Sequence, residues 1–169
     1  MKQAIAGVTP ASVGEVTVMT VWPSVAKFPV GKILGQCYSI SAGIYPLTIG
    51  NLAALASIPI ALGLYFLRIA PVYGQRYRLT NRRIVVLRGI KGVEVKSVDL
   101  DRFDSIELDA QPGMAWYDAA DLVFKQGKVE TFRLEGVSRP AAFRVACMKS
   151  HAAFVGVKKS LERQLAKAS

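Results

Sequence analysis

Acidic side chains gather in one short stretch of the sequence and are the first candidates for chemistry. Along an extended strand, residues two apart share a face, as Asp99 and Asp101 would. Two carboxylates on one face can bind a cation or transfer protons. Charged side chains on the solvated edge of a sheet are the plainer interpretation, which we adopt, because negative charge also guards an edge against pairing. The stretch contains Asp99, Asp101, Asp104, Glu107 and Asp109.

Other residue types that perform catalysis are few. His151 is the only histidine, and no serine or cysteine near it in sequence is placed to act as its nucleophile. We interpret it as a surface or packing residue of a C-terminal helix. Cys37 and Cys147 are far apart in the sequence, and they predict neither a disulfide nor a metal site. With no glycine-rich phosphate loop or nucleophile elbow, we expect a protein that is not an enzyme and has no cofactor.

Basic side chains form a second candidate site, in a chain of net charge +10. From Arg68 to Lys91 there are seven Arg or Lys residues and no acid. Basic residues beside a membrane span are attracted to anionic lipid headgroups, each by about 1 kcal/mol. Nucleic acid is the competing partner for such charge. The residues that we expect to bind headgroups or other anions are Arg76, Arg78, Arg82, Arg83, Arg88 and Lys91.

An uncharged stretch precedes this charge and would position it. No charged side chain occurs between Lys32 and Arg68. A membrane-spanning helix needs about 20 mostly apolar residues, and the stretch offers two segments near that length on either side of Gly50-Asn51, a turn dipeptide. We therefore predict a transmembrane hairpin of two helices over residues 30–70. A buried helical hairpin of a soluble protein is the alternative, but neither half has a polar face.

The flanks of the predicted hairpin indicate its orientation. Lys27 and Lys32 precede the first span and five arginines follow the second, whereas the turn between the spans has no charge. Because Lys and Arg favour the cytoplasmic ends of spans, we expect both termini in the cytoplasm. The basic residues would then lie at the bilayer, so we do not expect nucleic acid as a partner.

Small residues recur every four positions in both halves of the hairpin. Such stripes let helix backbones approach closely. We expect the two arms to pack on each other through them, and packing between copies of the chain in a homo-oligomer is the alternative. The first stripe is Gly31, Gly35, Ser39 and Gly43, and the second is Ala53, Ser57 and Ala61.

The rest of the chain predicts strands followed by one helix. Ser138 and Pro140 are typical of a helix start, so we expect a helix from Pro140 to the end. Residues 15–22 alternate and could add an edge strand or lie at the membrane surface. β-Branched or alternating segments, separated by turn residues, predict strands at residues 76–80, 83–88, 93–98, 103–108, 122–124 and 129–134.

An aromatic group follows the turn at Pro112-Gly113. Met114, Trp116 and Tyr117 could form an exposed loop that docks on a partner or at the bilayer interface, where aromatic rings are favoured. The alternative is that they fill the core of the domain.

The sequence Tyr-Arg-Leu-Thr-Asn-Arg-Arg at residues 77–83, followed by a β-branched strand and Gly89, resembles the opening hairpin of the bacterial pleckstrin-homology (PH) domain family. Residues 98–100 and 103–106 are similar to the acidic-apolar strand that follows it, and Trp22-Pro23-Ser24 resembles a Pro-Ser pair upstream. Many members place a transmembrane hairpin just before the domain. Residues 114–120 depart from the family pattern.

The resemblance implies an α+β membrane protein in which a transmembrane hairpin is followed by a PH-like antiparallel β-barrel or sandwich, closed by a C-terminal helix. We divide the chain into a cytoplasmic segment 1–29, the hairpin 30–70 and the PH-like domain 71–169, and expect it in the bacterial cytoplasmic (inner) membrane. The expected function is a scaffold or assembly factor for protein partners on the cytoplasmic face. Binding of anionic lipid or sensing of membrane stress is the alternative, and fold alone does not imply phosphoinositide recognition.

Overall fold

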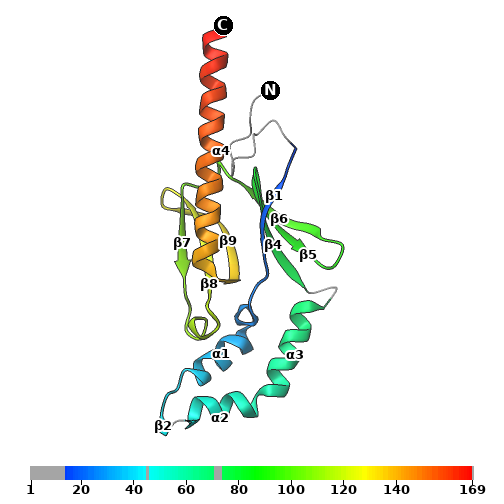
Figure 1. Cartoon of the computed structure of the whole chain (residues 1–169), viewed down its shortest axis with the longest axis vertical. Helices are drawn as coiled ribbons and strands as arrows, with labels where there is room; N and C mark the ends of the chain where they lie inside the picture. Colours follow the sequence, from blue (N-terminus) through cyan, green and yellow to red (C-terminus); the bar gives the residue numbers. More distant parts are fainter. Residues whose placement is uncertain (1–13, 45, 71–73, 169) are drawn as a thin grey trace.

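The computed structural model describes residues 14–44, 46–70 and 74–168. Two antiparallel sheets and a long helix form a β domain, and three short helices lie at one end of it (Figure 1). The chain enters the β domain in its first strand, leaves it for the short helices and then returns.

The first sheet has four strands, and its edge strand comes from the N-terminal segment. Asn81 secures this strand, because its side chain accepts a hydrogen bond from the Val16 N–H at 3.0 Å. Thr80 Oγ1 accepts from the Arg83 N–H at 2.9 Å and thereby closes the turn between the two central strands. Of the two alternatives for residues 15–22, the structure shows the edge strand, and the three strands predicted after it are present. In spatial order the sheet contains β1 (Thr17–Val21), β4 (Gln75–Thr80), β5 (Arg83–Arg88) and β6 (Val93–Asp99).

The second sheet is separate from the first, and neither is closed into a barrel, so of the two predicted forms only the layered one is present. Leu100 and Phe103 follow the last strand of the first sheet, and both are buried in the core between the layers. A single bridge between Pro23 and Val137 links the chain after β1 to the second sheet. That sheet contains β7 (Ser105–Asp109), β8 (Ala119–Gln126) and β9 (Val129–Ser138), in this order.

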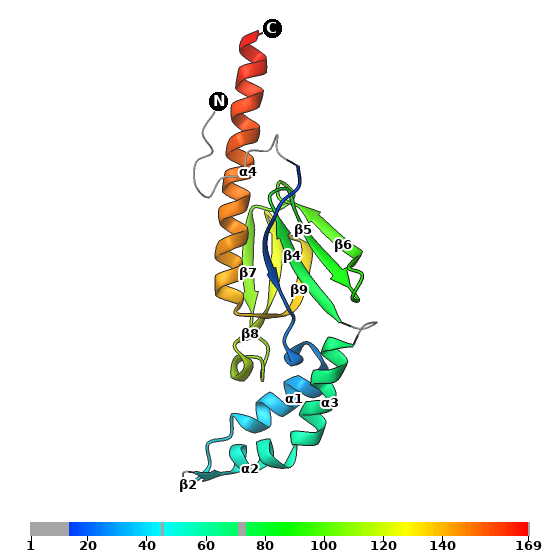
Figure 2. The ribbon, with the colours of Figure 1, turned by 45° about the vertical axis from the view of Figure 1, so that its right-hand side comes forward.

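The C-terminal helix α4 (Pro140–Ala168) covers the second sheet, as the helix-start residues predict. It begins directly after Arg139, whose φ of 51° turns the chain out of β9. Phe143 and Cys147 on its first turns are fully buried in the core between the layers. The helix then extends past the sheets (Figure 2).

The segment predicted as a two-helix hairpin is instead broken into three helices, so its predicted spans are wrong in their bounds. The first helix ends at Tyr38 and leads to a short two-stranded ladder. Gly50-Asn51, the predicted turn, lies inside the second helix. The Thr48 hydroxyl begins that helix by accepting from the Asn51 N–H at 3.3 Å. The elements are α1 (Pro29–Tyr38), β2 (Gly43–Ile44), β3 (Leu47–Thr48), α2 (Ile49–Ala56) and α3 (Ile58–Ile69).

Pro59 explains the second break. It lies in the first turn of α3, where its missing N–H is not needed, and it could not continue α2 without loss of a backbone hydrogen bond. No single helix among the described residues is both long and apolar enough to cross a membrane. Taken together, α2 and Ile58–Arg68 are long and apolar enough, but they are bent by 61° where they meet.

Close backbone contacts fasten α1 to the β domain. A Cβ atom on Gly31 would lie 2.1 Å from the carbonyl oxygen of Val25, in the short helix η1 (Val25–Lys27). A Cβ on Gly35 would lie 2.1 Å from the carbonyl oxygen of Gly113, in the loop between β7 and β8. Gly31 therefore packs on η1 and Gly35 on the loop between β7 and β8, and neither packs on the second arm of the helical segment.

Candidate functional site

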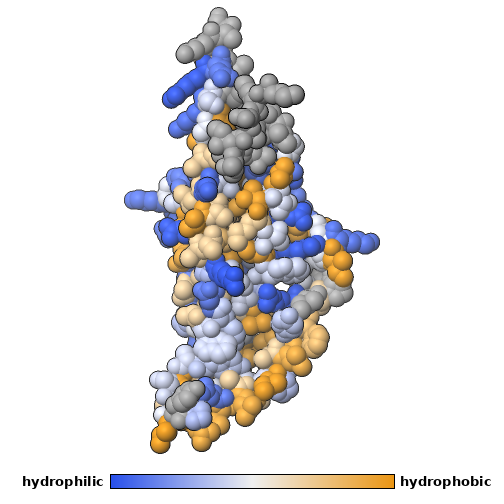
Figure 3. Space-filling view, viewed as in Figure 1, coloured by the Kyte–Doolittle hydropathy of each residue, from blue (hydrophilic) through white to orange (hydrophobic). Residues whose placement is uncertain are grey.

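The helical segment, α1 to α3, presents a broad apolar surface. Ile44 is 86% exposed, Leu55 66% and Phe66 64%. In Figure 3 hydrophobic side chains line the lower right edge and the bottom of this end of the molecule, beside more polar side chains on the left. Contiguous apolar surface of this extent is typical of a site that meets a membrane or another protein. On α2 and α3 the exposed large side chains are Ile49, Leu52, Leu55, Ile58, Ile60, Leu62, Tyr65, Phe66 and Leu67.

The two small-residue stripes do not face each other along their length. Gly31 contacts η1, and Gly35 contacts the loop between β7 and β8. Ser39 ends α1, and Gly43 lies beyond it in β2 with φ of 121°. The arms do meet at Ser57, whose hydroxyl is hydrogen-bonded to that of Tyr38. Gly50 makes a further close approach, since a Cβ there would lie 2.4 Å from the Tyr38 carbonyl oxygen. Ala53 and Ala61 are half-buried.

The six predicted anion-binding residues are divided over several places. Arg76, Arg78 and Arg83 project from the outer face of the four-stranded sheet, whereas Arg82 lies in the β4–β5 turn. Arg88 ends β5 near the helical segment, and Lys91 lies in the turn before β6. Arg76 is engaged locally: its Nη2 donates to the Ile90 carbonyl at 2.9 Å, and its guanidinium lies 5.7 Å from the centre of the Trp22 ring.

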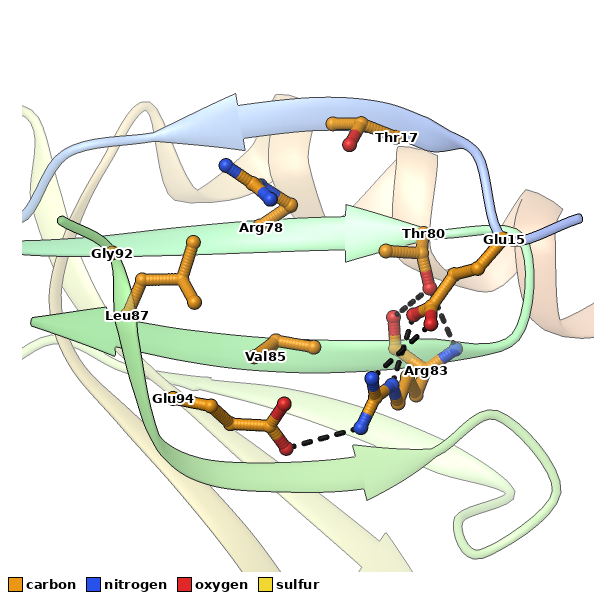
Figure 4. A pocket seen from close by; sticks show the side chains of 9 residues that line it. All are labelled: Glu15, Thr17, Arg78, Thr80, Arg83, Val85, Leu87, Gly92 and Glu94. Carbon is orange, nitrogen blue, oxygen red and sulfur yellow. Dashed lines mark hydrogen bonds and ion pairs between the residues drawn. The ribbon is translucent and has the colours of Figure 1, made fainter.

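A pocket of about 310 Å³ lies on this outer face, which we call the sheet-face groove (Figure 4). Val85 and Leu87 form its apolar floor, with Arg78 and Arg83 beside them. Arg83 donates to Glu15 and, through Nη1, to Glu94 at 3.0 Å. The hydrogen bond from Arg83 holds the pKa of Glu15 below its ordinary value of 4.5. The two arginines are thus matched by two carboxylates, so the groove has no net positive charge.

A second pocket, of about 200 Å³, lies where the helical segment joins the β domain, and we call it the junction pocket. Its charged side chains come from three elements: Lys27 from η1, Arg68 from the last turn of α3 and Arg88 from the end of β5. Sequence reasoning assigned only Arg88 to a site. Lys27 and Arg68 were recognisable as the basic residues that flank the apolar segment, but sequence alone does not bring them together.

The aromatic loop packs on α1. Met114 is fully buried against Ala26 and Ala119, so it cannot contact a partner in this conformation. Tyr117 is half-buried near Tyr38, and its burial and that neighbour raise the pKa of Tyr117 to about 12. Trp116, with its ring centre 4.7 Å from that of Tyr38, remains 52% exposed. Only Trp116 therefore presents much of its side chain as an interface residue.

Each residue of the acidic stretch has a partner. In the part of the chain that is described, no three His, Cys, Asp or Glu side chains are grouped as metal ligands would be. His151 Nδ1 lies 2.5 Å from the Leu100 carbonyl oxygen, and its ring packs on Phe103. The acidic residues pair with cations or cap a turn: Asp99 with Arg102, Asp101 with Lys158, Asp104 with the Gly127 N–H, Glu107 with Lys125 and Asp109 with Arg133.

Comparison with known proteins matches the chain to a protein family. The model of a protein family described as Bacterial PH domain matches residues 25–152. The match covers most of the chain and runs from η1 through the helical segment and strands β4 to β9 into α4, leaving out β1. No curated protein and no solved structure shows a significant similarity.

Proposed function

The chain belongs to the bacterial PH domain family, and we propose that it is a binding module whose helical segment holds it at a membrane, where the β domain assembles protein partners. The exposed apolar side chains of α2 and α3 are the observation that carries this proposal. Full burial of a Leu, Ile or Phe side chain gains about 1.5–3 kcal/mol. If each half-exposed side chain of these helices gained about half of that, insertion into lipid would be favoured by on the order of 10 kcal/mol.

The strand pairing supports one arrangement of the segment in the bilayer. β1, before the segment, pairs with β4, after it. Both ends of the segment therefore return to the same β domain and would lie on the same side of the membrane. Because the flanks carry Lys27, Lys32 and Arg68, the cytoplasmic face of a bacterial inner membrane is the side that the positive-inside rule favours.

The scaffold role would use the edge of the four-stranded sheet. β6 is the last strand of that sheet and pairs with no described strand on its outer side. Val93 and Val95 on this strand are exposed. An extended segment of a partner protein can add to such an edge through backbone hydrogen bonds. We therefore propose β6 as the edge on which the module receives its protein partners.

Flotation of the full chain with phosphatidylcholine vesicles tests the proposed attachment. Wild-type protein is expected to float with the vesicles. The double variant Leu55→Glu/Phe66→Glu, which places charge on the apolar surface, is expected to remain in the aqueous fraction. Val129→Glu/Val145→Glu is the matched control, because both valines are 66% exposed but lie on β9 and α4. Wild type that stays in the aqueous fraction, or a Leu55/Phe66 variant that floats as well as the control, would contradict the proposal.

A further inference from the structure

The junction pocket gathers positive charge without a carboxylate. Lys27, Arg68 and Arg88 line it, and its other lining residues are Pro23, Ser24, Phe28 and Gln75. In the described part of the chain, neither arginine has an ion pair with a carboxylate. The lining therefore has a formal charge of +3, in contrast to the sheet-face groove, where Glu15 and Glu94 balance two arginines.

Lys27 is held in place within this pocket. Its ammonium group donates to the Gln75 side-chain oxygen and lies 5.9 Å from the centre of the Tyr77 ring. Burial lowers the pKa of Lys27 because it disfavours the charged amine; Glu135 opposes this effect and Arg88 adds to it. An anion that entered the pocket would offset both the cost of burying this positive charge and its repulsion from Arg88.

The position of the pocket indicates where such an anion would come from. Arg68 lies in the last turn of α3, directly after the exposed Phe66 and Leu67. If α3 lies in lipid as proposed above, Arg68 marks the level at which hydrocarbon gives way to the polar headgroups. The opposite side of the pocket is the β domain. The three cations would thus lie at the depth of the lipid phosphates.

We propose that the junction pocket binds the phosphate group of an anionic phospholipid. This assignment rests on the proposed membrane attachment. A phosphate offers several oxygen acceptors to the guanidinium groups of Arg68 and Arg88, which can each donate two parallel hydrogen bonds. The acyl chains of the lipid would lie along the exposed apolar side chains of α3.

Binding of short-chain lipids to the full chain in uncharged detergent, measured by calorimetry, tests this site. Dihexanoyl phosphatidylglycerol is expected to bind saturably and at least tenfold more tightly than dihexanoyl phosphatidylcholine. Arg68→Gln/Arg88→Gln should weaken phosphatidylglycerol binding at least tenfold, whereas Arg68→Lys/Arg88→Lys, which keeps the charge, should retain most of it. Arg144→Gln/Lys149→Gln is the matched control, since it removes the same charge from exposed positions on α4.

The outcomes distinguish a lipid headgroup from free phosphate as the ligand. They also distinguish failure of the phosphate site from failure of the proposed membrane attachment. Inorganic phosphate that binds as tightly as phosphatidylglycerol would overturn the lipid as ligand and leave a phosphate site. Equal affinity for the two lipids, or equal losses in the Arg68/Arg88 variant and the α4 control, would overturn the site itself. Flotation with phosphatidylcholine reports apolar insertion alone, so a chain that floats but shows no preference for phosphatidylglycerol contradicts only the phosphate site.

Discussion

Arg83 and Glu15 form a two-pronged ion pair across the outer face of the four-stranded sheet. Arg83 Nε lies 2.9 Å from Glu15 Oε1, and Nη2 lies 3.1 Å from Oε2. The pair fastens the chain before β1 to β5 and, with Glu94, removes the positive charge that the sequence suggests for this face. The lining of the junction pocket, in contrast, contains three basic side chains and no carboxylate.

This pair predicts a pH dependence of stability. The folded-state pKa of Glu15 is lower than its unfolded-state pKa of about 4.5. The ion pair therefore stabilises the fold fully above pH 4.5, and this stabilisation is lost as the pH falls through the folded-state pKa. Arg83→Gln is expected to lower the free energy of unfolding by about 0.2–1 kcal/mol at pH 7, because both side chains are partly exposed. Denaturation by urea at pH 7 and pH 3 measures this difference, which should shrink at pH 3. A difference that is unchanged or larger at pH 3 would contradict the assignment.

Asp121 is expected to be the most sensitive carboxylate of the β domain. It is 2% exposed, and it accepts hydrogen bonds from the Gly136 N–H at 2.7 Å and from Gln111 Nε2 at 3.1 Å. Asp121→Ala would leave these buried donors unsatisfied, at a cost of about 2–4 kcal/mol in the free energy of unfolding. Asp121 also lies 3.4 Å from Arg133 Nη1. Asp109→Ala, at a more exposed carboxylate that pairs with the same arginine, should cost less than about 1 kcal/mol. Thermal denaturation of both variants measures the two losses of stability. Equal losses for Asp121→Ala and Asp109→Ala would contradict the special role of the buried carboxylate.

Gly35 is expected to control the attachment of α1. A Cβ on Gly35 would lie 2.1 Å from a backbone oxygen of Gly113, so Gly35→Ala must move the helix or the loop, at a cost of about 1–3 kcal/mol. Gly63→Ala is the control, because no atom lies within 4 Å of a Cβ at that position in α3. Protease digestion in detergent should cut Gly35→Ala faster around residues 36–46 and leave Gly63→Ala like wild type. Wild-type resistance in Gly35→Ala would show that this contact does not fasten the segment.

The thiol of Cys147 should report the integrity of the core. Its burial in α4 raises the pKa of Cys147 to about 12. Since only the thiolate reacts rapidly, the residue should resist iodoacetamide at pH 8 in the native chain and react in urea. Mass spectrometry of the peptide that contains Cys147 measures the modification. Rapid native labelling would mean that α4 does not pack as described.

The β domain could be predicted well from sequence because its strands carry local signals. Alternation and β-branched residues located β4, β5 and β6, and Pro140 located the start of α4. The helical segment could not be predicted in the same way. Because it has no charged residues, its sequence has no periodic polar pattern that would distinguish one long helix from several short ones. Gly50-Asn51 predicts a turn locally, yet Thr48 caps a helix there.

The candidate site was only partly predictable for a related reason. The basic residues of the strands alternate, so the pattern predicts that Arg76 and Arg78 share a face, as they do. It cannot show that Glu15, far away in sequence, neutralises Arg83 on that face. Nor can it place Lys27 and Arg68 in one pocket, because that arrangement depends on how the helical segment returns to the sheet.

Quenching by brominated lipid tests membrane insertion most directly. A fluorescent label at Leu55→Cys, in a Cys37→Ala background, would be compared with the same label at Val129→Cys in phosphatidylcholine vesicles whose acyl chains carry bromine. Strong quenching is expected at position 55 and none at position 129. Equal, weak quenching at both positions would show that α2 does not enter the hydrocarbon layer and would contradict the proposed function.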